Sequence, residues 1–107
     1  IGIRRNLEEA TKWYQKAADQ GVAPAQLELG ILLSAGAVNG IPDPINAYKW
    51  LQLAAKWGNV GAIAMLPKIA EEMTPAQILE AKDLAVNFVA RPTMEEIYVE
   101  PPPNSVK

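Results

Sequence analysis

The stretch ATKWYQKAADQG, from Ala10 to Gly21, returns in altered form as AYKWLQLAAKWG, from Ala47 to Gly58. The second copy begins 37 residues after the first, and seven of the twelve positions are identical. The same offset places Leu29 on Leu66, so the correspondence extends beyond the quoted stretch. Internal repeats with a period of this length are typical of solenoids built from stacked helical units. The repeating unit is therefore predicted to be a pair of helices.

The first copy has the apolar spacing and the boundary residues of a helix pair. Its apolar residues recur at intervals of three and four, as on one face of an amphipathic α-helix. Asn6 and Glu9 match a capping box, which predicts that the first helix starts there, and Gly21 is expected to end it. Pro24 suits the first turn of a second helix, which is expected to end before Gly36. The apolar stripe of the first helix consists of Ala10, Trp13, Tyr14, Ala17 and Ala18.

The second copy has the same boundary signals. Residues 36–43 are predicted to form a loop, after which Asp43 caps a helix that has Pro44 in its first turn. Gly58 is expected to end this helix, as Gly21 ends the first. The next helix contains Pro67, and we expect this interior proline to kink the helix or end it early, because proline has no backbone donor.

A fifth helix has no counterpart in the repeat. Thr74 and Gln77 form a start signal, with Pro75 in the first turn between them. Helical apolar spacing then continues to about Ala90, and Pro92 prevents further extension. Because a solenoid has to cover the apolar face of its last unit, this helix is predicted to be the C-terminal cap.

These elements predict an all-α fold, an α/α superhelix or solenoid. We expect about two helix-pair repeats, at about residues 7–36 and 44–72, followed by a capping helix at 75–90. Together they form one predicted solenoid domain over residues 1–92. Residues 93–107, which are rich in proline and glutamate, are predicted to be an extended or disordered tail.

The composition argues against several classes of function. Ten basic and twelve acidic residues give a net charge of −2, so no excess positive charge favours nucleic acid as a partner. The sequence has no histidine and no cysteine, which removes the commonest general base, the commonest transition-metal ligands and the usual catalytic triads. No apolar run is long enough to span a bilayer, so membrane insertion is not expected. We therefore expect no enzymatic activity and no cofactor.

Both copies carry the residues of a known repeat family. In the first copy they are Ala10, Trp13, Tyr14, Lys16, Ala17, Ala18, Gly21, Ala25, Gln26, Leu29, Gly30 and Gly36. In the second copy they are Ala47, Lys49, Trp50, Leu51, Ala54, Ala55, Gly58 and Ala62. These residues resemble the Sel-one-like repeat, a relative of the tetratricopeptide repeat. The second copy departs from the family at Pro67, where the family has glycine.

The resemblance extends to both sides of the repeats. The helix that starts at Thr74 is similar to the closing helix of many bacterial members of the family. Gly2 and Ile3 look like the loop that ends a preceding repeat, which implies that further repeats come before this segment. For function, the resemblance implies an adaptor or scaffold for protein complexes, with no catalytic motif to carry over.

Stacked helix pairs curve into a superhelix, whose concave side offers a groove for a protein or peptide partner. Trp13 and Trp50 share one repeat position on an apolar face, so both are predicted to pack in the core. Trp57 replaces the polar Gln20 of the first copy, so it is predicted to lie at least partly outside the core and to anchor a partner. The alternative is that Trp57 fills a local gap beside the kink expected at Pro67. The residues predicted to bind the partner are Lys12, Gln15, Tyr48, Lys49, Gln52 and Trp57; a merely solvated face is the alternative for the first five.

Two other functions stay open at the level of sequence. The chain is alternatively a structural self-assembly module, in which the N-terminal edge or the tail packs on another copy. The prolines Pro101–Pro103 suit this role, because a preformed polyproline helix can dock into an aromatic groove. The chain is otherwise a targeting domain of a larger protein that carries its activity elsewhere.

Overall fold

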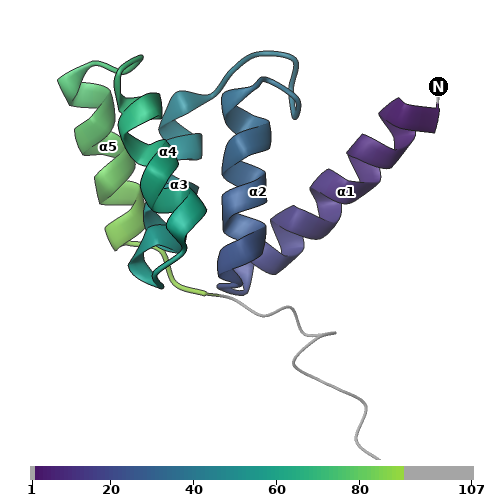
Figure 1. Ribbon diagram of the computed structural model, residues 1–107, viewed down its shortest axis with the longest axis horizontal. Coiled ribbons are helices and arrows are strands. Elements are labelled where there is room, and N and C mark those ends of the chain that lie inside the picture. Colours follow the sequence, from purple (N-terminus) through teal and green to yellow (C-terminus); the bar gives the residue numbers. More distant parts are fainter. Residues whose placement is uncertain (1, 91–107) are drawn as a thin grey trace, which may run out of the picture.

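The computed structural model describes the backbone of residues 2–90 and the side chains of residues 7–90, and this part of the chain is all-helical (Figure 1). The predicted fold class, a helical repeat solenoid, is confirmed. The structure shows five helices among these residues: α1 (Gly2–Asp19), α2 (Ala23–Ser34), α3 (Pro44–Lys56), α4 (Val60–Ala70) and α5 (Pro75–Val86).

Helix α3 is the centre of the arrangement. It packs against α2 on one side and against α4 and α5 on the others, whereas α1 packs mainly on α2. Figure 1 shows α1 and α2 meeting at their shared turn and diverging toward the opposite end of the molecule. The C-terminal ends of α1, α3 and α5 all lie at the lower end in this view. The fifth helix thus covers α3, as expected of a cap.

Local capping interactions account for most helix starts. The Asp43 carboxylate accepts from the backbone N–H of Asn46 at 3.2 Å, and Asn59 caps α4 in the same way. Thr74 and Gln77 form the predicted capping box, with reciprocal hydrogen bonds of 3.1 and 2.9 Å. Such caps satisfy amide groups that the helix itself leaves unpaired.

Two helix boundaries differ from the expectation. Helix α1 begins at Gly2 and runs through Asn6, so the predicted start at Asn6 is wrong, and so is the loop expected at Gly2 and Ile3. Residues 1–5 contain no proline that would interrupt a helix. Helix α5 ends at Val86 instead of Ala90.

The other predicted boundaries are partly tested. Asn87 follows α5 as its C-cap, and its side-chain amide donates to the Asp83 carbonyl at 2.9 Å, which satisfies an acceptor of the last turn. Helix α4 continues past Pro67 and ends three residues later at Ala70. The division into repeats at 7–36 and 44–72 stays a prediction, and the predicted tail at 93–107 lies outside the described residues.

Two clusters of buried side chains form the core. The first lies where α1, α2, α3 and α5 meet and includes Leu29, Leu33 and Trp50. The second lies where α3, α4 and α5 meet and includes Leu51 and Ile69. Burial of such side chains is the main favourable term in folding.

The two tryptophans of the repeat have different environments. Trp50 is 3% exposed, and its ring meets the Phe88 ring edge to face at 5.4 Å, so its predicted core position is confirmed. Trp13 is 68% exposed, so its predicted core position is wrong. The reason is that neighbouring helices and Phe88 cover Trp50, whereas no segment within residues 2–90 covers the corresponding face of α1.

Helices α2 and α3 cross closely at Gly30. A Cβ atom at this position would lie 2.9 Å from Cγ of Leu51 and 3.2 Å from the carbonyl oxygen of Ala47. The buried side chain of Gln26 donates from Nε2 to the Ala18 carbonyl at 3.2 Å, which ties α2 to the end of α1. These contacts hold α1, α2 and α3 in fixed relative positions.

Candidate functional site

A groove of about 570 Å³ lies between α3 and α5. Its floor is apolar, since Leu53 and Ala85 are 5% and 7% exposed and belong to the first core cluster. Grooves with an apolar floor and a few polar groups at the rim are typical binding sites. The lining residues are Gln52, Leu53, Ala55, Lys56, Lys82, Ala85 and Val86.

The two lysines make this groove locally basic. Lys56 is the last residue of α3 and Lys82 lies in α5, and both side chains are exposed. Neither lysine has an ion pair with a carboxylate among the side chains of residues 7–90. A carboxylate of a bound partner is therefore able to pair with them.

Lys49 lies on the same face of α3 as Gln52 and Lys56, at a spacing of three and seven residues. Its Nζ lies 4.0 Å from the ring centroid of Trp50 and 5.9 Å from that of Phe88. Burial of the amine lowers the pKa of Lys49 below its ordinary value of 10.5, and the Asp19 carboxylate raises it in part. Lys49 is thus a half-buried cation that also packs on the core.

The structure places Tyr48 elsewhere than predicted. Its side chain is 7% exposed and packs in the second core cluster with Leu51 and Ile69, so its predicted place in the open groove is wrong. The spacing of three residues puts Tyr48 and Leu51 on one face of α3, and both residues belong to the cluster that joins α3 to α4. This apolar pair was the signal in the sequence that indicated burial.

Lys12 and Gln15 lie on a separate surface. Both are exposed on α1, where they line a shallow depression of about 420 Å³ with Thr11, Lys16 and Asp19. Gln15 donates from Nε2 to Oδ1 of Asp19 at 3.1 Å. Because α1 packs mainly on α2, these residues do not join Gln52 in one continuous site.

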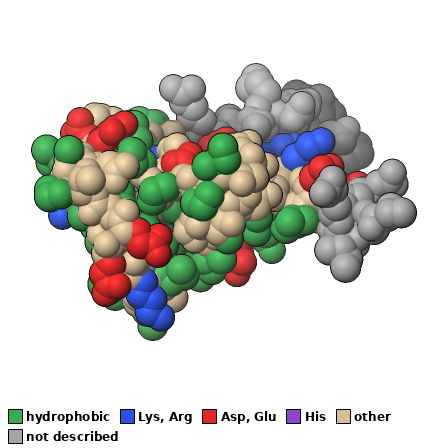
Figure 2. All heavy atoms as spheres, turned by 90° about the horizontal axis from the view of Figure 1, so that it is seen from above, with side chains coloured by type: hydrophobic (Ala, Val, Ile, Leu, Met, Phe, Trp, Pro, Cys, Tyr) green, Lys and Arg blue, Asp and Glu red, His purple; other side chains and the backbone are tan. Residues whose placement is uncertain are grey.

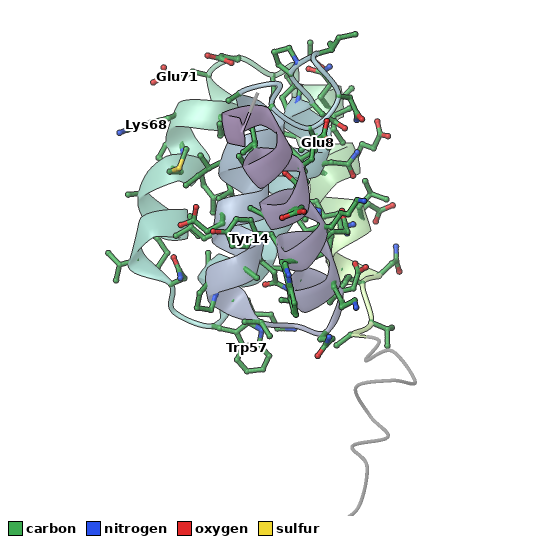
Figure 3. All side chains as sticks on the ribbon, turned by 90° about the vertical axis from the view of Figure 1, so that its right-hand side faces the viewer. Glu8, Tyr14, Trp57, Lys68 and Glu71 are labelled. Carbon is green, nitrogen blue, oxygen red and sulfur yellow. The ribbon has the colours of Figure 1, made fainter. Side chains whose placement is uncertain are left out.

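Trp57 caps the C-terminal end of α3 and is 68% exposed, which confirms that it lies outside the core. Figure 3 shows its ring at the lower end of the molecule, pointing away from the helices. Val60 and Ile63, which follow it in the chain, are also exposed, at 77% and 51%. Partner binding by Trp57 stays a prediction.

Sequence reasoning missed two features. The first is the pairing of Lys56 with Lys82 in one groove, which the sequence does not reveal because the two lysines belong to different helices. One signal was available: Lys56 stands where the first copy has Asp19, so the charge at this repeat position is reversed. An apolar groove of about 380 Å³ between α1 and α2 was also missed, because Trp13 shares its repeat position with the buried Trp50. Its lining residues are Trp13, Tyr14, Ala17, Val22, Pro24, Ala25, Leu27 and Glu28.

Apolar and charged side chains are interspersed on the face of the molecule that Figure 2 shows. Figure 2, which views the molecule from above, shows hydrophobic side chains at several separate places among acidic, basic and polar ones. Across residues 2–90, no helix has the length and apolar character needed to cross a membrane. The same residues contain no group of three or more carboxylates, histidines or cysteines placed to hold a metal ion.

Comparison with known proteins gives two matches. A family model described as Sel1 repeat matches residues 1–22 and 23–59, more than half of the chain. The chitin synthase regulatory factor 3 of Schizosaccharomyces pombe is 41% identical over 56 residues, which are 52% of this chain and 6% of that protein. No solved structure matches significantly. The expected similarity to bacterial members gains no support from these matches, since this relative is a yeast protein.

Proposed function

Because the chain belongs to the Sel1 repeat family, we propose that it is a non-catalytic scaffold that holds a protein or peptide partner in the groove between α3 and α5. Sel1 repeats generally mediate protein–protein interactions. The yeast relative is named as a regulatory factor, which agrees with a role in binding. The chain itself spans a small part of that relative, so an adaptor role within a larger assembly belongs to the proposal.

The observation that carries the proposal is the combination of an apolar floor with two lysines in one groove. Apolar contact with Val86, which is 80% exposed beside the floor formed by Leu53 and Ala85, supplies affinity, since the partner's apolar side chains leave water there. Lys56 and Lys82 supply orientation, because a charge at the rim selects partners of opposite charge. The partner favoured by this chemistry is an extended segment with apolar and acidic side chains.

The residues predicted from the sequence to bind the partner differ in their distance from the groove, and so in their proposed roles. Gln52 lines the groove and offers its amide to the backbone of an extended partner. Lys49 contributes its charge beside the groove, while Lys12, Gln15 and Trp57 are contacts for a partner that extends beyond it.

Peptide selection followed by fluorescence anisotropy tests the proposal. We expect a random peptide library to yield acidic, apolar peptides, and we expect Lys56→Glu with Lys82→Glu to weaken their binding at least tenfold. Lys68→Glu, an exposed position on α4 outside the groove, is the matched control and leaves the affinity within about twofold. Equal affinity for the groove and control variants would show that the partner binds elsewhere.

Self-assembly is a second candidate, favoured by the apolar groove between α1 and α2. Trp13 is 68% exposed in this groove, and exposed apolar surface of this kind is often buried between copies. Sedimentation over a range of concentrations distinguishes the two candidates. A mass that rises with concentration, and that Trp13→Ala returns to that of the monomer, supports self-assembly.

A further inference from the structure

The basic groove lies close to the place where the described chain ends. Val86, the last residue of α5, lines the groove, and only residues 87–90 separate it from the end of the described segment. Phe88 packs edge to face on Trp50. A Cβ atom at Gly21 would lie 3.3 Å from Cβ of Ala90, so Ala90 lies against the turn after α1. The chain thus leaves at the end of the molecule where α3 and α5 also end (Figure 1).

The next residues are long enough to return to the groove. Four residue steps lead from Val86 to Ala90, and five more lead from Ala90 to Glu95. An extended chain spans about 3.3–3.6 Å per residue in either direction, so Glu95 is able to reach back to the position of Val86. Pro92 lies within this return, and proline is favoured at the second position of a tight turn.

The chemistry of these residues complements the groove. Glu95, Glu96 and Glu100 supply carboxylates, and Ile97, Tyr98 and Val99 supply apolar side chains between them. The groove complements this pattern: its two lysines have no carboxylate partner among residues 7–90, and its floor is apolar. A covalently attached segment also has a high effective concentration, so weak ion pairs suffice to keep it bound.

We propose that residues 95–100 of the chain's own C-terminal segment occupy the groove between α3 and α5, with Glu95 and Glu96 paired to Lys56 and Lys82. The segment thereby competes with the partner for the groove. Docking follows from charge complementarity and reach, whereas the competition rests on the function proposed above. The shared site makes the segment an internal regulator of partner binding.

Zero-length crosslinking of the full chain tests the docking. A carbodiimide joins a lysine amine to a carboxylate only when the two are in contact, and mass spectrometry of the digest identifies the pair. We expect links from Lys56 and Lys82 to Glu95 and Glu96 at low ionic strength, and we expect them to disappear at high salt. Links from these glutamates mainly to Lys12 or Lys68, or no links at all, overturn the docking.

Crosslinking a mixture of ¹⁵N-labelled and unlabelled chains shows whether the docked segment belongs to the same chain as the groove or to a second copy. Links within one chain carry a single isotope, and this is the expected result. Links that join labelled to unlabelled peptides, and that fade on dilution, show that the segment comes from a second copy and overturn the intrachain proposal.

Partner affinity tests the competition independently. The variant Glu95→Gln with Glu96→Gln keeps the full chain and changes only the segment's charge, and we expect it to bind a selected acidic peptide about 3–10 times more tightly. Glu71→Gln with Glu72→Gln, an exposed acidic pair at the end of α4, is the matched control and leaves affinity unchanged. Equal affinity for both variants overturns the competition. If Lys56 and Lys82 crosslink to Glu95 and Glu96 but no selected peptide binds the chain, the proposed function is refuted and the docking of the segment still stands.

Discussion

Replacing Trp50 by alanine tests how much of the fold depends on one repeat position. A buried tryptophan removes about 150–250 Å² from water, which at about 25 cal/mol per Å² corresponds to about 4–6 kcal/mol. This figure is an upper bound, because the unfolded chain already buries part of the surface. Measured losses for aromatic-to-alanine changes in cores are about 3–5 kcal/mol. Since Trp50 is 3% exposed and contacts Phe88, we expect a loss in that range.

Such a loss is large compared with the stability of a small domain, which is about 5–15 kcal/mol. The matched controls are Trp13→Ala and Trp57→Ala, because both residues are tryptophans that are 68% exposed. About a third of each side chain is buried, so by the same area argument we expect each control to lose about 1–2 kcal/mol.

Urea unfolding followed by far-ultraviolet circular dichroism measures all three variants, since this signal does not depend on the tryptophan removed. The slope of the transition should stay constant while its midpoint falls most for Trp50→Ala. A loss for Trp13→Ala equal to that for Trp50→Ala would refute the reasoning, because it would mean that repeat position alone determines burial.

Three further predictions concern a helix crossing, a charge and a cap. Gly30→Ala should destabilise the fold by about 1–2 kcal/mol in urea unfolding, because its Cβ would meet α3 at 2.9 Å and this overpacking exceeds the gain in helix propensity. At Gly61 a Cβ would lie 3.0 Å from the end of the flexible Leu27 side chain and 3.4 Å from Oδ1 of Asn59, so Gly61→Ala should be neutral or stabilising. An equal loss at both positions would contradict the crossing argument. An NMR titration should give Lys49 a pKa below 10.5, and Asp19→Asn should lower it further, because Asp19 favours the charged amine. Because the unfolded chain keeps the Lys49 proton to higher pH than the folded chain, the buried charge lowers the free energy of unfolding at pH values below the folded pKa. This loss disappears as pH rises from the folded pKa to 10.5. An increase in the pKa of Lys49 in Asp19→Asn would contradict the role assigned to Asp19. Thr74→Ala should cost about 1 kcal/mol through loss of the capping box, and Thr74→Ser should retain most of it in the same assay.

Local signals explain why the sequence predicted the helices well. Caps at Asp43 and Thr74, and the glycines that end α1 and α3, act within a few residues of their own position, so they can be read without knowing the tertiary structure. The 37-residue repeat then shows that helices come in pairs. These two kinds of signal together predict the fold class.

Burial depends on neighbours that such signals do not identify. Trp13 and Trp50 occupy one repeat position, yet only Trp50 lies under Phe88, which comes from beyond the capping helix. The sequence predicts Tyr48 to bind the partner in the groove, but the burial of Tyr48 depends on where α4 packs. Repeat position therefore predicts the face of a helix, and the adjoining elements decide whether that face is covered.

The difference between the two repeat copies matters more for function than their similarity. Asp19 ends the first helix of one copy, and Lys56 ends the first helix of the other, so the two equivalent positions carry opposite charges. Asp19 acts on Lys49 of the next copy, whereas Lys56 faces the groove with Lys82. In the proposed complex, an extended partner that crosses both copies meets Asp19 beside Lys12 and Lys16 at α1, and the pair Lys56 and Lys82 between α3 and α5. The two lysines of the groove favour a partner whose acidic residues lie at α5, which is also the side from which the chain's own glutamates would come.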